Sequence, residues 1–341
     1  MDGRRTALRI VVLIPVGVLV IAATTLLGPT RIEWAAITDV TWREVVGADQ
    51  PSNVFWHLRV PRSLLAAVAG AGLAIGGVIF QTLFRNPLAT PYTLGIASGA
   101  SLAAALGFLS GWQGTLLGGI PRLVLLAFGG AMIAMSLVFL MSRLRRGKDM
   151  TRLLLAGVCV AYMCSAGVLL ITYLADRAVT NDIVVWMMGS LGTLRPRAAL
   201  EITIVLVPVL VFALCSHRSL DLLMLGNDVA ASRGVHVERT VWISFGLVGL
   251  LTAIVVANCG PIGFVGLMVP HMARAVFGVR ALPLVVGAAV LGAVFLAICD
   301  GLARSLPVVE LPVGVTTNIL GAVFFFYMLA RHDFTHNAVR P

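Results

Sequence analysis

The sequence predicts an all-α, polytopic membrane protein with about ten transmembrane helices. Composition gives the first reason, because 59% of the 341 residues are hydrophobic, only 12% are charged, and the mean hydropathy is +0.98. Apolar runs long enough to cross about 30 Å of hydrocarbon also recur along the whole chain. A soluble domain of this length would need far more charge to cover its surface. We therefore expect residues 1–341 to form one transmembrane domain.

The apolar runs give the order of the expected spans. They lie at residues 10–28, 62–83, 91–109, 121–142, 153–175, 198–215, 240–258, 261–277, 282–299 and 313–330. The eighth is short and contains Pro270, so a half-helix is the alternative to a full crossing there. Glycines spaced G-x-x-x-G in the second and third spans predict close helix packing.

Basic residues concentrate in alternate connections between the spans. With the amino terminus inside, the inner segments hold most of the 25 Lys and Arg, whereas the 15 acidic residues are commoner in the outer segments. Retention of basic residues on the cytoplasmic side accounts for the formal charge of +10. The charge therefore predicts a multi-pass protein with both termini in the cytoplasm, and it gives no reason to expect a nucleic-acid partner.

An amphipathic segment at residues 216–239 separates the sixth and seventh spans. Its pattern predicts two short helices, with Gly226 ending the first, Asn227 or Asp228 capping the second, and Gly234 closing it. The segment is either a docking surface for a soluble partner or an inner loop whose leucines lie on the membrane surface. In the first case Leu222, Leu223, Leu225 and Val229 would supply the apolar contacts.

Several kinds of chemistry are missing from the sequence. No Asp, Glu, Lys or Arg stands near the middle of an expected span, which argues against a carrier driven by protons or sodium. No G-x-x-x-x-G-K-[ST] loop occurs, so a nucleotide site would belong to another polypeptide. The five cysteines lack the spacing of a metal or redox site. We expect neither catalytic residues nor a bound metal in this chain.

Between the second and third spans, Pro87 and Pro91 predict a stiff, irregular turn. Together with this turn, several separated blocks resemble the permease subunits of ATP-binding-cassette (ABC) importers for ferric siderophores, haem and cobalamin. The blocks occur in the order expected for that family: Arg59–Arg62, Arg85–Ala89, Arg152–Gly157, Trp186–Ser190, Leu225–Gly226 with Gly234–Val235, Gly260–Leu267 with Pro270–His271, Asp300 with Ala303–Arg304, and Glu310–Val315.

The resemblance implies a type II ABC importer permease fold in a bacterial cytoplasmic membrane, with about ten helices per subunit and both termini inside. A second copy of the permease, or a homologous permease, would stand beside this chain in the bilayer. Two ATPase subunits would bind the inner face, and a periplasmic or lipid-anchored substrate-binding protein would bind the outer face. The chain would then be no enzyme and would hold no cofactor, since ATP and Mg would bind the ATPase subunits.

The resemblance also assigns residues to the two docking faces. The coupling segment, residues 216–239, would dock on the ATPase through Leu220, Leu222, Leu223, Leu225, Gly226, Asn227, Asp228, Val229, Arg233 and Gly234. On the outer face, Arg59, Arg62 and Arg304 match arginines that pair with glutamates of the binding protein in the cobalamin member, a task that suits guanidinium groups. The alternatives are an interfacial anchor for Arg59 and Arg62, and a local ion pair with Asp300 for Arg304.

Four residues match the family's cytoplasmic gate. Asn86 and Leu88 match residues that narrow it, and Met150 and Thr151 occupy the turn that supplies a second constriction. Met150 is a departure, because the cobalamin member has small hydroxyl residues at that turn, and an ordinary loop residue is the alternative.

For the cargo, the prevalence of the family's substrates favours a ferric siderophore, with haem and then cobalamin as alternatives. The alternative from a different class is an ion-coupled secondary transporter, which would use Asn318, Asn258 or Gln81 as polar groups along its pathway.

Overall fold

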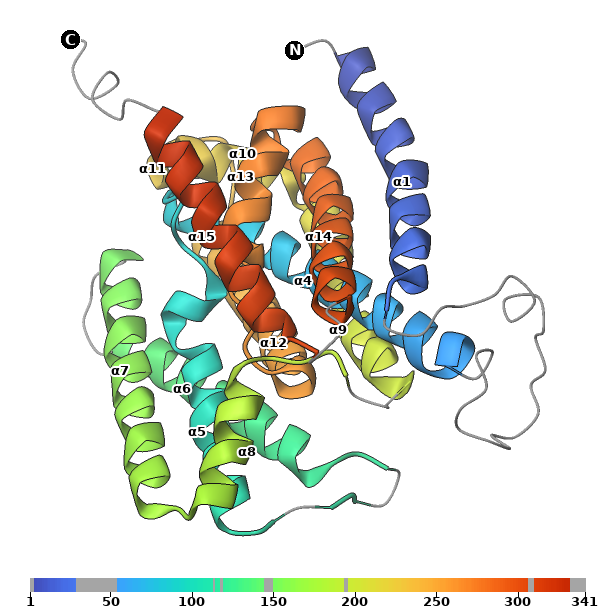
Figure 1. Cartoon of the computed structure of the whole chain (residues 1–341). Coiled ribbons are helices and arrows are strands. Elements are labelled where there is room, and N and C mark those ends of the chain that lie inside the picture. Colours follow the sequence, from blue (N-terminus) through green and yellow to red (C-terminus); the bar gives the residue numbers. More distant parts are fainter. Residues whose placement is uncertain are drawn as a thin grey trace.

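The computed structural model describes residues 3–28, 54–112, 114–116, 119–143, 150–192, 196–305 and 310–331. These residues form helices throughout (Figure 1). In chain order they are α1 (Gly3–Leu26), a π-helix η1 (Val54–Arg59), α4 (Val60–Phe84), a 3₁₀ turn η2 (Pro91–Leu94), α5 (Ile96–Leu109), α6 (Arg122–Arg143), α7 (Met150–Leu174), α8 (Arg177–Met187), α9 (Pro196–Cys215), α10 (His217–Leu225), α11 (Asn227–Ser232), α12 (Val237–Cys259), α13 (Val265–Phe277), α14 (Ala281–Arg304) and α15 (Val313–Arg331).

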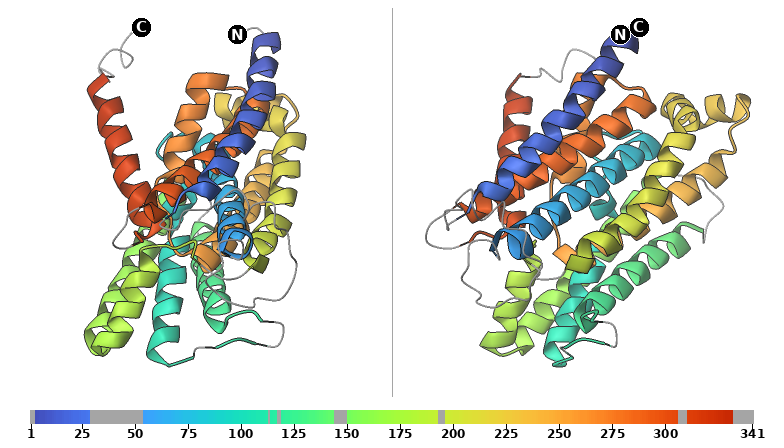
Figure 2. Two further views of the ribbon diagram at one scale, coloured as in Figure 1. Left: turned by 45° about the vertical axis from the view of Figure 1, so that its right-hand side comes forward. Right: turned by 90° about the vertical axis from the view of Figure 1, so that its right-hand side faces the viewer.

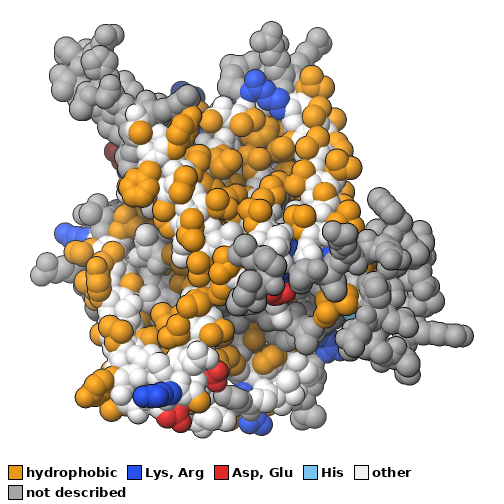
Figure 3. Space-filling view, viewed as in Figure 1, with side chains coloured by type: hydrophobic (Ala, Val, Ile, Leu, Met, Phe, Trp, Pro, Cys, Tyr) orange, Lys and Arg blue, Asp and Glu red, His pale blue; other side chains and the backbone are white. Residues whose placement is uncertain are grey.

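The predicted all-α membrane fold is confirmed. Within the described residues, 7 helices are long and apolar enough to cross a membrane, namely those of α1, η1 with α4, α6, α7, α9, α12 and α14. Three shorter apolar helices, Ile96–Leu109, Val265–Phe277 and Val313–Met328, correspond to the remaining expected spans. Hydrophobic side chains cover most of the helical surface visible in Figure 3, and few charged side chains interrupt them. Such a surface suits hydrocarbon rather than water.

The centre of the bundle is α4. It packs along α14 and also contacts α9, α12 and α13, while α1 lies on the other side of α14. Helix α5 packs between α6 and α7. Glycines let α4 and α14 approach closely, because a Cβ at Gly292 would stand only 2.4 Å from the carbonyl oxygen of Gly70.

Both ends of the chain lie on one side of the bundle. The start of α1 and the end of α15 are at the top of Figure 1, as are α10 and α11. In the right-hand view of Figure 2 most of the long helices run side by side with a common tilt, so they can be followed from this end of the bundle to the opposite end. The arrangement agrees with an even number of crossings between the termini.

Two expected spans differ in detail from the structure. The third begins with η2 and a left-handed Gly95 at φ 76° before α5 starts, because Pro91 and Gly95 interrupt a regular helix. The eighth is the short α13, preceded by an irregular stretch at residues 260–264. Irregular backbone inside a membrane needs hydrogen-bond partners within the protein. The hydroxyl of Tyr92 is one such partner, because it accepts a hydrogen bond of 3.0 Å from the Ile262 N–H.

Sequence analysis missed α8, an amphipathic helix at the end opposite α10. Its start carried a readable signal, since the Asp176 carboxylate accepts a hydrogen bond of 2.8 Å from the Val179 N–H. An aspartate three residues before an amide it can reach is a typical N-cap.

Candidate functional site

The α10–α11 segment consists of two short helices that meet at Gly226, as predicted. Gly226 ends α10 with φ 132° and ψ 153°, and its N–H donates to the Leu223 carbonyl. Gly234 closes α11 at φ 82°, and the next amide, that of Val235, donates to the Ala230 carbonyl over 3.0 Å. Capping by Asn227 or Asp228 was wrong, because Gly226 itself occupies the N-cap and no side chain bonds there.

The leucines of this segment divide into two faces. Leu220 and Leu223 are 0% and 2% exposed, so they hold α10 against α4, α9 and α14. Leu225 and Val229 are 69% and 41% exposed and therefore present an apolar surface outward. The expectation that Leu220 and Leu223 are docking contacts needs correction, since both side chains pack inside the chain; Leu222 is half-buried.

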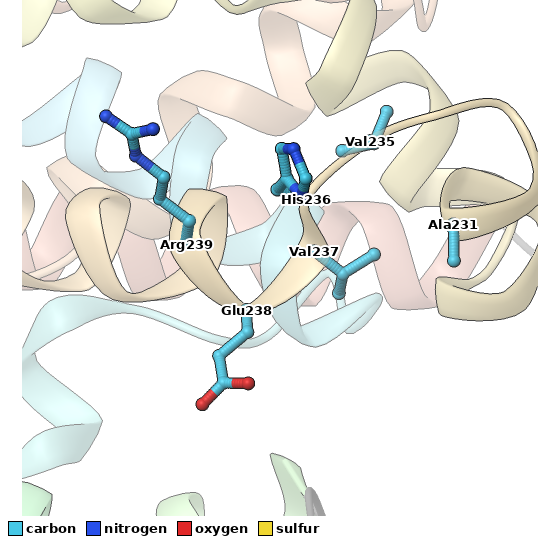
Figure 4. Close-up of a pocket in the computed structure, with 6 residues that line it drawn as sticks. All are labelled: Ala231, Val235, His236, Val237, Glu238 and Arg239. Carbon is cyan, nitrogen blue, oxygen red and sulfur yellow. The ribbon is translucent and has the colours of Figure 1, made fainter.

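Basic side chains surround the turn from α11 into α12. One open groove of about 500 Å³ is lined by Arg218, Arg233 and Arg239 together with polar and apolar side chains from α9, α10 and α12, and no acidic residue lines it. A neighbouring groove of about 590 Å³ is shown in Figure 4, where Arg239 and His236 project to one side of the chain and Glu238 to the other. The arginines make the first groove positive, and it belongs to the same segment as the exposed Leu225 and Val229.

One hydrogen bond ties α10 to a distant helix. The Asp221 carboxylate accepts a hydrogen bond of 2.6 Å from the N–H of Ala281, the first residue of α14. The preceding residue, Arg280, makes no side-chain cap. Asp221 therefore caps α14 from outside its own segment, a role that sequence analysis missed because the two residues are 60 positions apart.

A buried ion cluster lies at the opposite end of α14. Asp300 is 0% exposed and receives Arg62 Nε at 2.8 Å and Arg304 Nη2 at 3.0 Å. Arg62 also reaches the exposed Glu310 at 3.0 Å. Two arginines, one from α4 and one from α14, thus share one acid, whose negative charge compensates theirs in an apolar setting.

The last turn of α1 supplies further partners for this cluster. Arg59 Nη1 donates to the Leu26 carbonyl at 3.0 Å, and Arg304 Nη2 donates to the Thr24 carbonyl at 3.3 Å. The orphan carbonyls at a helix C-terminus are natural acceptors for a cation. The two arginines therefore fasten α1 to the α4–α14 pair.

These contacts change what is expected of the three outer arginines. Arg59 and Arg304 are 4% and 3% exposed, so in this structure neither presents its guanidinium group to a partner. The local ion pair considered for Arg304 is present. Arg62 remains partly accessible, and its docking role stays a prediction.

The two-proline turn is a compact, ordered loop. Arg85 ends α4 in a left-handed conformation at φ 48°, and the Asn86 side chain accepts a hydrogen bond of 2.9 Å from the Leu88 N–H. The turn leaves Leu88 59% exposed. Asn86 thus shapes the turn and Leu88 projects from it; their action as a gate stays a prediction. Met150 and Thr151 begin α7, but their side chains lie outside the described residues.

The polar groups considered for an ion-coupled pathway have different surroundings. Gln81 is buried on α4, donates to the Leu267 carbonyl at 3.3 Å and accepts a hydrogen bond from Arg274 on α13. Asn258 is buried and bonds to the Ile254 carbonyl of its own helix at 3.0 Å. Asn318 is exposed on α15. Gln81 therefore links α4 to α13, and the Asn258 amide is engaged within α12.

One chain thus has this order of helices, a split α10–α11 segment and an irregular stretch before α13. The FecCD transport family matches residues 13–331 of it. This chain belongs to the FecCD transport family. The resemblance found in the sequence blocks is confirmed.

Permeases named for different substrates are similarly related to this chain. Hemin transport system permease protein HmuU of Yersinia pestis is 37% identical over 291 residues, covering 82% of this chain and 85% of the relative. Fe(3+) dicitrate transport system permease protein FecD of Escherichia coli is 37% identical, covering 86% and 92%. Vitamin B12 import system permease protein BtuC of Serratia proteamaculans is 37% identical, covering 81% of each chain.

A solved structure supports the same assignment. A chain described as an inward-facing, metal-chelate type ABC transporter matches with a TM-score of 0.79 and 29% identity, covering 95% of this chain and 100% of that one. This FecCD protein is thus a multi-pass ABC importer permease and has the permease fold.

Proposed function

We propose that this chain is the permease subunit of an importer that carries a ferric siderophore across a bacterial cytoplasmic membrane by alternating access. The observation that carries the proposal is the α10–α11 segment, which holds two leucines inside, exposes Leu225 and Val229, and contributes Arg218 and Arg233 to a groove that no acidic residue lines. Such a surface suits a cleft on a soluble ATPase that is apolar at its centre and acidic at its rim.

Orientation follows from charge. Arg218, Arg233 and Arg239 lie with both chain ends on one side of the bundle, and basic residues favour the cytoplasmic side. Both termini would then be cytoplasmic, with ATP and Mg bound by two ATPase subunits there. A binding protein would dock at the other side, where Arg62 and Glu310 reach the surface.

Iron-chelate relatives support a ferric siderophore as cargo. FecD is named for Fe(3+) dicitrate and the solved neighbour for a metal chelate. HmuU and BtuC are named for hemin and vitamin B12, so haem and cobalamin are the alternatives within the family.

Reconstitution tests the proposal. The permease is placed in liposomes with its ATPase inside and the loaded binding protein outside, and uptake of ferric siderophore, haem and cobalamin is measured with and without ATP. We expect uptake of ferric siderophore only when all components and ATP are present. Uptake by the permease alone along an ion gradient would support the secondary transporter instead, and preferred uptake of haem or cobalamin would reassign the cargo.

A further inference from the structure

Helix α14 links the two functional ends of the molecule. It has 24 residues and is therefore about 36 Å long, from Ala281 beside α10 to Arg304 in the outer ion cluster. Its backbone touches that of α4 at Gly70 and Gly292, where no room remains for even one methyl group. The two helices are therefore expected to move together as a rigid pair.

The α10–α11 segment holds this pair at one defined point. Among the described residues, the bond from the Ala281 N–H to Asp221 is the only hydrogen bond or ion pair that joins residues 217–234 to a helix not adjacent in sequence. Ala281 is 2% exposed, so its amide would be left without a partner if the carboxylate moved away. Other contacts of α10 with α4, α9 and α14 involve the buried side chains of Leu220 and Leu223, which are apolar and non-directional.

We propose that Asp221 is a positioning residue that transmits displacement of the α10–α11 segment to α14, and through α14 to the outer ion cluster. The inference rests on the proposed function, in which the ATPase moves that segment. A hydrogen bond between a carboxylate and the first amide of a helix resists both pulling and sliding, because it is directional and favoured by the helix dipole. Leucine contacts alone would let α10 slip over α14.

The chain allows this bond to be broken from either side. Asp221→Leu removes the acceptor and keeps a similar volume, whereas Asp221→Asn keeps an oxygen that can accept the bond. Ala281→Pro removes the donor, and proline is favoured at the first position of a helix. The preceding Arg280 has φ −66° and ψ 132°, which suits a residue before proline.

The experiment measures cargo taken up per ATP hydrolysed by the reconstituted complex, together with the affinity of the ATPase for the permease. We expect Asp221→Leu and Ala281→Pro each to lower this ratio about tenfold, as loss of one hydrogen bond to a charged group predicts, with ATPase affinity unchanged. The double variant should be no worse than either single variant, because both remove the same bond. Asp221→Asn should retain most of the uptake.

Asp176→Leu is the matched control, because it removes an aspartate cap of the same kind from α8, which lies at the end of the bundle opposite α10 (Figure 1). It should leave the ratio of cargo to ATP unchanged.

The proposal is overturned by wild-type uptake in Asp221→Leu or Ala281→Pro, by losses that multiply in the double variant, or by loss of ATPase binding. Should Asp221→Leu fail to accumulate, Ala281→Pro decides alone. Absence of ATP-driven uptake in the wild type contradicts the proposed function itself, whereas undiminished uptake in the variants contradicts only the link.

Discussion

Charged side chains have opposite roles at the two ends of α14. At the outer end, Asp300 and Arg304 are almost fully buried and form an ion pair with one another. At the inner end, Arg218, Arg233 and Arg239 have no ion pair among the described residues, and the same segment exposes Leu225 and Val229. Charges that are paired and buried stabilise the fold, whereas unpaired exposed charges beside apolar side chains are available to a partner. The comparison predicts that mutations at the two ends fail in different ways.

The largest effect is expected at Asp300. Asp300→Asn keeps the size of the side chain but leaves the buried Arg304 without a counter-charge and Arg62 with only the exposed Glu310. Removing one partner from a buried ion pair costs about 3–5 kcal/mol, so the free energy of unfolding should fall by that amount. Thermal unfolding of the purified protein in detergent measures it. An unchanged melting temperature would show that the cluster is not structural.

A pair of leucines on α10 sharpens the contrast within one helix. Leu220→Ala empties a fully buried site and should destabilise the permease by about 2–5 kcal/mol. Leu225→Ala removes an exposed side chain, so stability should change by about 0.5 kcal/mol or less, while affinity for the ATPase should fall about tenfold. Unfolding and ATPase binding are measured for both variants. Equal loss of ATPase affinity without loss of stability in Leu220→Ala would contradict the division into two faces.

The close contact of α4 with α14 predicts a smaller, purely steric effect. A methyl group at Gly292 would meet the Gly70 carbonyl, so Gly292→Ala should destabilise the protein by about 1–3 kcal/mol. Gly246→Ala on α12 is the control, because nothing lies within 4 Å of the added carbon. It should leave stability unchanged or raise it through helix propensity. Equal free energies of unfolding for the two variants would mean that α4 and α14 can move apart without loss of stability.

Sequence reasoning located the spans and the coupling segment because both depend on local pattern. Apolar runs identify helices whatever they pack against, and Gly226 interrupts an amphipathic pattern within a few residues. The roles of Arg59, Asp221 and Arg304 depend instead on partners far along the chain, such as the carbonyl of Thr24, which lies 280 residues from Arg304. Residue type alone showed that these side chains could bind a carboxylate or a carbonyl. Apart from the local pair of Arg304 with Asp300, it could not show which distant residue of the same chain is the partner.

The smallest expected effect concerns the one part of the outer cluster that reaches solvent. Glu310 is 54% exposed and holds Arg62 Nη1 at 3.0 Å, so Glu310→Gln should change the free energy of unfolding by about 1 kcal/mol or less. The substitution also releases that nitrogen of Arg62, while Asp300 continues to hold Nε. A carboxylate of a docked binding protein could then replace Glu310, and affinity for the binding protein should rise a few-fold at low salt and lose this gain at about 1 M salt. Binding is measured on the reconstituted permease, with Asp182→Asn on α8 as a control that removes the same charge away from Arg62. A rise of equal size in the control would attribute the gain to net charge, and weaker binding in Glu310→Gln would show that the glutamate itself contacts the partner.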